Sequence, residues 1–195
     1  TGISRSNVYR ALAGLVEKGA AYTSEENATK YMGIDVEEFC SNKIRRMEQY
    51  KEILAVNMPK EREETEGYLT VSGDEQIQHK IKNMLLSANK RVYLSMSAKN
   101  LKKFIPEISQ LIEQKVKFVV LSNKAPDLLG IKFYLTENKE QQVGVITDSR
   151  NVLTGELGNG EYSTCLYSGQ SNLVRVFKDS LKNEIKLIEL TGGVK

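Results

Sequence analysis

The opening of the chain carries side chains that could read DNA. Hydrogen-bonding and cationic residues crowd the first turns of an expected helix: Ser4, Arg5, Ser6, Asn7, Tyr9 and Arg10. An arginine can form two hydrogen bonds to guanine and an asparagine two to adenine, whereas serine and tyrosine more often hold phosphates. These side chains predict a DNA-recognition helix; the alternative is an exposed, well-capped polar helix start.

Candidates for catalysis and metal binding are few. His79 is the only histidine, and the two cysteines, Cys40 and Cys165, lie far apart in the sequence. The sequence has no CxxC motif and no pair of histidines that could hold zinc, and a mechanism with a histidine base would depend on His79 alone. We expect no catalytic residue, no metal and no cofactor. Two lone thiols are typical of the reducing cytoplasm.

The composition is that of a globular protein. The 195 residues are 40% hydrophobic and 27% charged, and 28 Lys+Arg against 25 Asp+Glu give a net charge of +3. This balance excludes a mostly disordered chain, and so small a net charge neither indicates nor excludes nucleic-acid binding. No apolar run approaches the roughly 18 residues of a membrane span, and no signal peptide opens the chain. We predict a cytoplasmic protein.

The N-terminal third has the pattern of a helix, a hairpin and a long helix. Residues 3–18 place apolar side chains at helical spacing, with Ser4 as N-cap and Gly19 as terminator. A short hairpin is expected around residues 24–27, and it carries Lys30 as a seventh candidate DNA contact. Residues 35–58 predict a long helix with a 4-3 seam typical of a coiled coil: Cys40, Ile44, Met47, Leu54 and Met58, interrupted by Lys51.

From Gly67 onward strands and helices alternate, which predicts an α/β layer structure with a parallel or mixed sheet. Ser72 and Glu75 fit a capping box before a helix through residues 77–88. Pro106 is tolerable in the helix at 101–114 if a new first turn begins there. The expected strands are residues 68–71, 91–96, 117–121, 131–135, 143–147, 151–153 and 163–167, and a final helix covers 172–190.

Two stretches resemble the TrmB-type transcriptional regulators. TGISRSNVYRALAGLVEKGA looks like their recognition helix, and KYMGIDVEEF like the wing exit and the start of their linker helix. The resemblance implies a winged helix-turn-helix, a coiled-coil linker and a C-terminal effector or interaction domain. The family pattern has two helices before the position of Thr1. We therefore expect a fragment of a longer protein that binds DNA poorly by itself.

The segment QQVGVITDSRNVLTGELGN resembles the core strand pair of the phospholipase D superfamily. That family uses His-x-Lys-x4-Asp, followed by Gly-Ser-x-Asn, for phosphodiester chemistry. When Asp148 and Gly155 are aligned, Gln141 takes the histidine position and Val143 the lysine position, while Glu156 and Gly158 replace serine and asparagine. Glutamine is no nucleophile toward phosphorus, valine holds no phosphate, and a glutamate repels one. The resemblance thus implies a degenerate, non-catalytic scaffold.

A degenerate active site often remains a pocket. Hydroxyls, an amide and carboxylates near the expected strand ends suit a neutral sugar or polyol, and these are the predicted effector-binding residues: Ser95, Ser97, Ser122, Asn123, Asp148 and Glu156. An alternative stays open for Asp148, because the residues after it favour a tight turn that its carboxylate could cap.

The fold prediction is α/β: a partial winged helix at 1–34, a coiled-coil linker helix and hinge at 35–66, and a phospholipase D-like α/β sandwich with a mixed sheet at 67–195. The function hypothesis is a homodimeric regulator that binds double-stranded operator DNA and whose C-terminal domain senses a small molecule or dimerises. The alternatives are a divergent phosphodiesterase or nuclease, and a pure interaction module. The sequence indicates no membrane partner.

Overall fold

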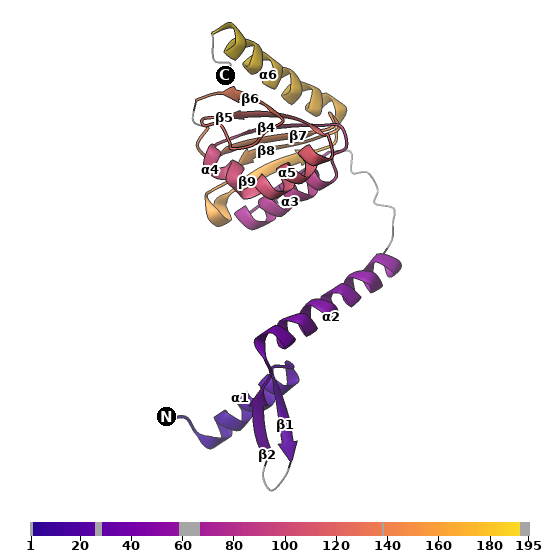
Figure 1. Ribbon diagram of the computed structural model, residues 1–195, viewed down its shortest axis with the longest axis vertical. Helices are drawn as coiled ribbons and strands as arrows, with labels where there is room; N and C mark the ends of the chain where they lie inside the picture. The colour runs from indigo at the N-terminus through magenta and orange to yellow at the C-terminus, as the bar shows by residue number, and fades with distance from the viewer. Residues whose placement is uncertain (1, 26–28, 59–66, 138, 192–195) are drawn as a thin grey trace. The chain divides into compact units, whose positions relative to one another are not determined.

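The computed structural model describes residues 2–25, 29–58, 67–137 and 139–191. The chain divides into two compact units, unit 1 at Thr1–Glu63 and unit 2 at Glu64–Lys195 (Figure 1). Residues 59–66, where the predicted hinge lies, and residues 26–28 at the tip of the hairpin are outside the described residues.

Unit 1 begins with α1 (Arg5–Glu17), whose two ends have the expected caps. The Ser4 hydroxyl accepts a hydrogen bond from the Asn7 amide at 3.4 Å. At the other end Gly19 takes a φ of 71°, and the amides of Gly19 and Ala20 bond back to the carbonyls of Val16 and Leu15. These two hydrogen bonds form a Schellman motif, which needs a residue that tolerates a positive φ. The predicted helix and both of its caps are confirmed.

The predicted hairpin and long helix of unit 1 are also confirmed. Strands β1 (Ala21–Glu25) and β2 (Thr29–Gly33) pair antiparallel. Helix α2 (Val36–Asn57) starts at Asp35, whose carboxylate accepts the amides of Glu37 and Glu38. The Tyr22 hydroxyl donates to Glu38 at 2.9 Å and so ties the hairpin to the first turn of α2. This hydrogen bond raises the pKa of Tyr22.

Unit 2 is built on a seven-stranded mixed sheet with the order β3-β9-β8-β7-β4-β5-β6. Strands β4, β5 and β6 are parallel, and every other neighbouring pair is antiparallel, which confirms the predicted mixed sheet. The strands are β3 (Tyr68–Ser72), β4 (Arg91–Met96), β5 (Lys117–Ser122), β6 (Ile131–Leu135), β7 (Gln142–Thr147), β8 (Asn151–Glu156) and β9 (Thr164–Ser168).

Helices cover both faces of this sheet (Figure 1). On one face lie α3 (Asp74–Leu86) and α5 (Ile105–Glu113), which contribute Ile77, Ile81 and Ile108 to the main core. On the other face lies α6 (Ser171–Leu190), whose Val174 packs with Ile146 and Val152 in a smaller core. The core on the α6 face is therefore smaller than the core on the other face, and α6 contributes one buried side chain to it, Val174.

Two local details of unit 2 differ from the expected pattern. The predicted capping box at Ser72 and Glu75 is wrong, because Gly73 is the N-cap of α3 and no side chain caps it. The expected helix at 101–114 is divided into α4 (Ala98–Leu101), a 3-10 turn η1 (Lys102–Phe104) and α5. Pro106 lies in the first turn of α5, as predicted, where a missing amide costs no hydrogen bond.

Candidate functional site

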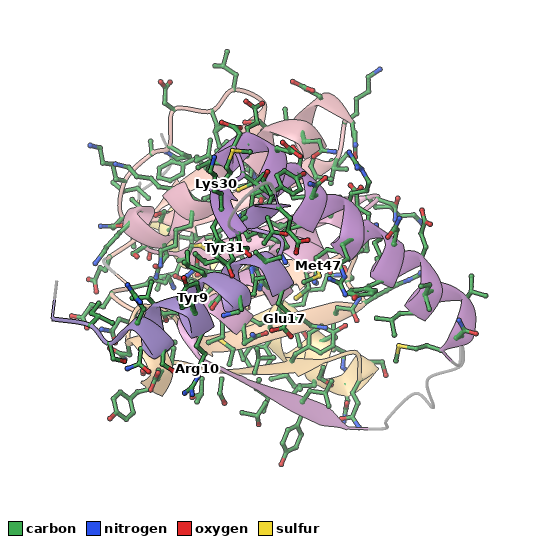
Figure 2. All side chains as sticks on the ribbon, turned by 90° about the horizontal axis from the view of Figure 1, so that it is seen from below. Tyr9, Arg10, Glu17, Lys30, Tyr31 and Met47 are labelled. Carbon is green, nitrogen blue, oxygen red and sulfur yellow. The ribbon has the colours of Figure 1, made fainter. Side chains whose placement is uncertain are left out.

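All seven predicted DNA contacts are exposed in unit 1. Six lie in or beside the first two turns of α1, and Lys30 lies on β2: Ser4, Arg5, Ser6, Asn7, Tyr9, Arg10 and Lys30. The side chains of Tyr9 and Arg10 project from α1 and that of Lys30 from the hairpin (Figure 2). The first turn of α1 contains no acidic residue that would repel a phosphate.

The helical period of 3.6 residues divides these candidates between two sides of α1. The apolar residues Val8, Leu12, Leu15 and Val16 form one stripe, which is half-buried or exposed in unit 1. Arg5 and Tyr9 lie beside this stripe. Ser6, Asn7 and Arg10 lie on the opposite side.

Helix α2 exposes the predicted seam along its whole length. Ile44 is 60% exposed, Met47 68% and Leu54 54%, and Cys40 and Met58 are exposed as well. No side chain of α2 is buried. Such a row on an otherwise charged helix is what a second helix could cover in a coiled coil.

The structure does not bring the six predicted effector residues together in unit 2. Asp148 lies at the opposite end of the sheet from the rest, because β7 runs antiparallel to β4 and its last residues lie beside Arg91, the first residue of β4. Its carboxylate accepts the amides of Asn89, Lys90 and Arg91 at 2.8 to 2.9 Å. Burial raises the pKa of the Asp148 carboxyl, but these three bonds outweigh it and the pKa lies below its usual value.

Asp148 and Ser149 form a tight β-turn between β7 and β8. Their φ values of 52° and 55° are both positive, as at the two central residues of a type I′ turn, and the Arg150 amide donates to the Thr147 carbonyl at 2.9 Å. The alternative structural interpretation of Asp148 is thus supported, with one difference: the carboxylate caps the loop before β4 and not its own turn. We assign it no ligand.

Ser95 and Glu156 line a first cavity of about 430 Å³, hollow 1, which lies between the sheet and α6. Ser97 and Asn123 line a second cavity of about 530 Å³, hollow 2, which lies beside α4. These two side chains already bind the backbone, since the Ser97 hydroxyl accepts from the Asn100 amide and the Asn123 side chain accepts from the Ala98 amide. Ser122 is fully buried, and neither cavity includes it.

The positions aligned with phospholipase D residues are also separated. Gln141 and Gly158 line hollow 2, whereas Val143 is 3% exposed and belongs to the main core. Gly155 allows β8 to approach β9 closely, because a Cβ there would lie 2.2 Å from the Thr164 carbonyl oxygen. His79 is exposed on α3 and lines neither cavity.

Asp74 accepts a cluster of hydrogen bonds that the sequence did not predict. The Asp74 carboxylate accepts the Ser163 hydroxyl at 2.5 Å and the Gly158 amide at 2.8 Å. Burial raises its pKa, but these bonds, one from Gly160 and the nearby Lys103 lower it below the usual value. Asp74 and Ser163 are 89 residues apart, so no local pattern could indicate this pair.

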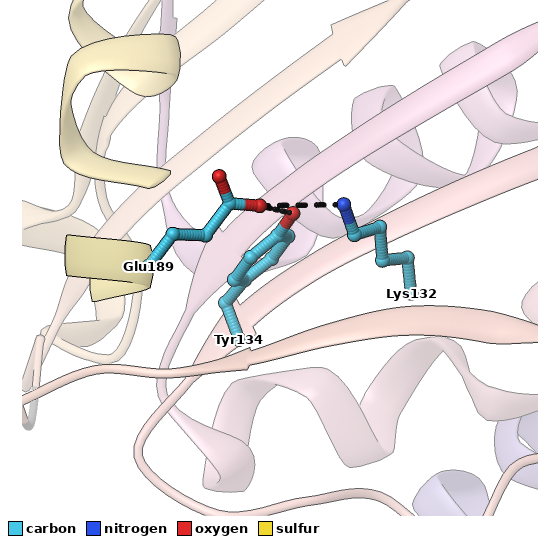
Figure 3. Close-up of polar contacts among 3 residues, drawn as sticks. All are labelled: Lys132, Tyr134 and Glu189. Atoms are coloured by element: carbon cyan, nitrogen blue, oxygen red, sulfur yellow. Dashed lines mark hydrogen bonds and ion pairs between the residues drawn. The ribbon is translucent and has the colours of Figure 1, made fainter. Parts of the chain in front are cut away.

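A second unpredicted cluster joins β6 to α6 (Figure 3). The buried Tyr134 donates its hydroxyl to Glu189 at 2.7 Å, and the Lys132 ammonium lies 3.4 Å from the same oxygen. The hydrogen bond from Tyr134 lowers the pKa of Glu189, and burial raises that of Tyr134. These contacts hold α6 over the edge of the sheet.

Over the described residues, no group of three potential metal ligands comes together. Within the same ranges, no helix combines the length and the apolar character needed to cross a membrane.

The chain resembles known proteins along most of its length. It is 22% identical over 201 residues to YrhO of Bacillus subtilis (strain 168), covering 97% of this chain and 73% of YrhO. The sequence matches no family profile. Among solved structures it is similar to TrmBL2, an archaeal chromatin protein described as showing a novel mode of DNA binding, with 18% identity and a TM-score of 0.55. That match covers 94% of this chain and 82% of TrmBL2.

A second, weaker likeness covers less of the chain. NUC from Salmonella typhimurium, a phospholipase D family member, is 10% identical, with a TM-score of 0.47 over 60% of this chain and 91% of that one. The fold is thus like that of TrmBL2, and phospholipase D family members are among its structural neighbours.

Proposed function

We propose that the chain is a TrmB-type transcriptional regulator, in which α1 reads operator DNA and unit 2 is a non-catalytic, phospholipase D-like domain that senses a small molecule. The observation that carries this proposal is α1 itself. Its Ser6, Asn7 and Arg10 face away from the apolar stripe, which leaves them free to enter a major groove. The order helix, hairpin, long helix and α/β domain follows a fold like that of TrmBL2, which supports the same interpretation.

The seam of α2 supports a homodimer. Two copies that cover Ile44, Met47 and Leu54 would place two copies of α1 on one duplex, as a two-fold operator requires. A monomer at micromolar concentration in sedimentation velocity would contradict this part of the proposal. The cytoplasmic location stays a prediction.

The absence of catalysis is also a proposal. It is supported by Gln141 and Val143, which offer neither a nucleophile nor a cation where phospholipase D enzymes have them. We expect bis(p-nitrophenyl) phosphate to hydrolyse no faster with the protein than in buffer. Turnover above the rate in buffer would favour the alternative, a divergent phosphodiesterase.

DNA recognition can be tested with a duplex that the full-length protein selects from a random library. Arg10→Ala should weaken binding by about 5- to 150-fold, the range for one lost bidentate base contact. Affinity should fall as salt rises, because phosphate contacts release counterions. The matched control is Arg175→Ala, an exposed arginine of α6, which should change affinity less than twofold. Equal effects of the two variants, or no selected sequence, would refute the assignment of α1.

A further inference from the structure

Strand β3 forms one edge of the seven-stranded sheet, and among the described residues it pairs with β9 alone. The amide of Gly73, directly after β3, donates to the carbonyl of Ser163, directly before β9. Because backbone groups point to alternate sides along an antiparallel strand, Val71 and Leu69 also face β9. The other three residues of β3 direct their N–H and C=O groups to the free edge of the sheet: Tyr68, Thr70 and Ser72.

This free edge lacks the features that commonly prevent edge strands from pairing with another chain, which are charged side chains, proline, bulges and a covering element. Strand β3 contains no charged residue and no proline, and its register with β9 runs without a bulge. The opposite edge, β6, has both a charge and a cover, because it carries Lys132 and because Tyr134 binds Glu189 of α6. The β3 edge is therefore the one that is open to pairing.

Strand β3 is self-complementary when two copies run antiparallel about a two-fold axis at Thr70. Thr70 then lies opposite Thr70 of the second copy, and Tyr68 lies opposite Ser72. Each of the three outward residues in each copy donates its N–H to an outward C=O of the other, which makes six hydrogen bonds across the axis. A shift by two residues would leave one outward residue of each copy without a partner in β3.

The side chains of β3 fit the same register. Leu69 lies on the same face of the sheet as Val71, which packs against the main core, but Leu69 is 48% exposed. Across the axis Leu69 lies opposite Val71 of the second copy in a non-hydrogen-bonded pair, whose Cα atoms are about 4.5 Å apart. On the other face the two Thr70 side chains meet, and such pairs stabilise neighbouring strands. The pairing thus covers Leu69 and extends the main core across the axis.

The position of β3 in the sequence favours a second copy as its partner. Tyr68 begins β3 ten residues after Met58, the last residue of the α2 seam. Two α2 helices joined through this seam would hold two copies of β3 at a high effective concentration. The pairing needs this help, because a pair of such short strands buries less than the roughly 1,200 Å² of a stable interface.

We propose that the β3 edge is an interface between two copies of this chain, at which the two sheets join into one continuous sheet through an antiparallel β3 pair centred on Thr70. This inference rests on the homodimer of the proposed function. The α2 seam supplies most of the affinity, and the β3 pair determines how the two copies of unit 2 join.

Disulfide cross-linking of the full-length protein tests the register, in a Cys40→Ser background that leaves only the buried Cys165. Thr70→Cys should form a linked dimer under mild oxidation, because Cα atoms in a hydrogen-bonded pair lie about 5.5 Å apart, within the range of a disulfide. Tyr68→Cys and Ser72→Cys should each fail to link with themselves, because equivalent Cα atoms would lie about 13 Å apart. A mixture of these two variants should link after subunit exchange, as a non-reducing gel would show.

Thr70→Pro tests the contribution of the pairing to affinity. The N–H of Thr70 faces the free edge, so proline removes no hydrogen bond to β9 and is tolerated as in other edge strands. Its circular dichroism spectrum should match that of the wild type, while the dimer dissociation constant from sedimentation should rise at least about tenfold. The matched control is Thr70→Val, which keeps the N–H and should change this constant less than about threefold.

The outcomes separate the β3 pair from the rest of the proposed function. A dimer in which Thr70→Cys does not link, or in which Tyr68→Cys links with itself equally well, would overturn the β3 pair and leave the homodimer in place. An unchanged dissociation constant in a folded Thr70→Pro variant would overturn it as well. A wild-type monomer at micromolar concentration would overturn both. The cysteine variants keep every backbone group, so they decide the question even if the proline variant does not fold.

Discussion

Asp148 offers a direct test of the structural role that replaces its predicted ligand role. Its carboxylate accepts three backbone amides, and its φ is 52°. At about 1 kcal/mol for each partly exposed bond, Asp148→Ala should cost about 3 kcal/mol, and the positive φ adds about 1 kcal/mol. Asp148→Gly loses the bonds but relieves the backbone and should cost about 3 kcal/mol. Asp148→Asn tolerates this φ and keeps one acceptor oxygen, so it should cost about 1 to 2 kcal/mol.

Urea unfolding followed by far-UV circular dichroism measures these differences. Asp179→Ala is the control, because Asp179 forms only an exposed pair with Lys182 on α6 and should change stability by less than about 0.5 kcal/mol. An alanine variant of Asp148 within about 0.5 kcal/mol of the wild type would refute the account of the three bonds. A glycine variant less stable than the alanine variant would refute the account of the backbone.

The pH dependence gives an independent check on the same carboxylate. Its pKa in the folded protein lies below the value of about 3.9 for an unfolded aspartate. A lowered pKa contributes stability above the unfolded value, and this contribution is lost as pH falls through the folded pKa. The stability difference between wild type and Asp148→Asn should therefore be largest near neutral pH and shrink below about pH 4.

Two further outcomes follow from the packing of β8 against β9. Gly155→Ala should destabilise unit 2 by more than about 3 kcal/mol in urea, because its Cβ would lie 2.2 Å from the Thr164 carbonyl oxygen at a φ of 152°. Gly144→Ala should cost less than about 1 kcal/mol, because its Cβ would be in ordinary van der Waals contact with Ser95, 3.7 Å from the Ser95 Cβ. The buried Cys165, whose pKa burial raises to about 11, should be alkylated by iodoacetamide only after urea is added, as peptide mass spectrometry would show. Rapid labelling of native Cys165 would contradict its buried position.

The elements of this protein could largely be predicted from local patterns. The cap at Ser4, Gly19 after α1 and the restart at Pro106 are signals within a few residues of their effect, and each appears in the structure. The capping box predicted at Ser72 does not form, because a residue far away in the sequence contacts the start of α3. The amide of Gly73 bonds to the carbonyl of Ser163, and this contact with a distant loop determines how α3 begins.

The spatial grouping of the predicted effector residues could be predicted only in part, because it depends on strand direction. Asp148 follows a strand, as Ser97 does, but β7 and β4 are antiparallel, so their last residues lie at opposite edges of the sheet. Residue types alone cannot distinguish the two edges. Ser95 and Glu156 do share a cavity, yet one wall of that cavity belongs to α6, which comes later in the chain and showed only an amphipathic pattern in the sequence.

The position of β3 at the edge of the sheet has a consequence for biosynthesis. The carbonyl of Gly67, just before β3, accepts the hydroxyl of Ser168 at the end of β9, 101 residues later. At about 5 to 20 residues per second, a ribosome needs about 5 to 20 seconds to make the chain between them. During that time Tyr68 and Leu69, with no charged neighbour inside β3, have no strand to pair with. Unit 2 therefore begins with a segment that depends on one of its last strands, and a chain truncated before β9 exposes an uncharged strand suited to aggregation.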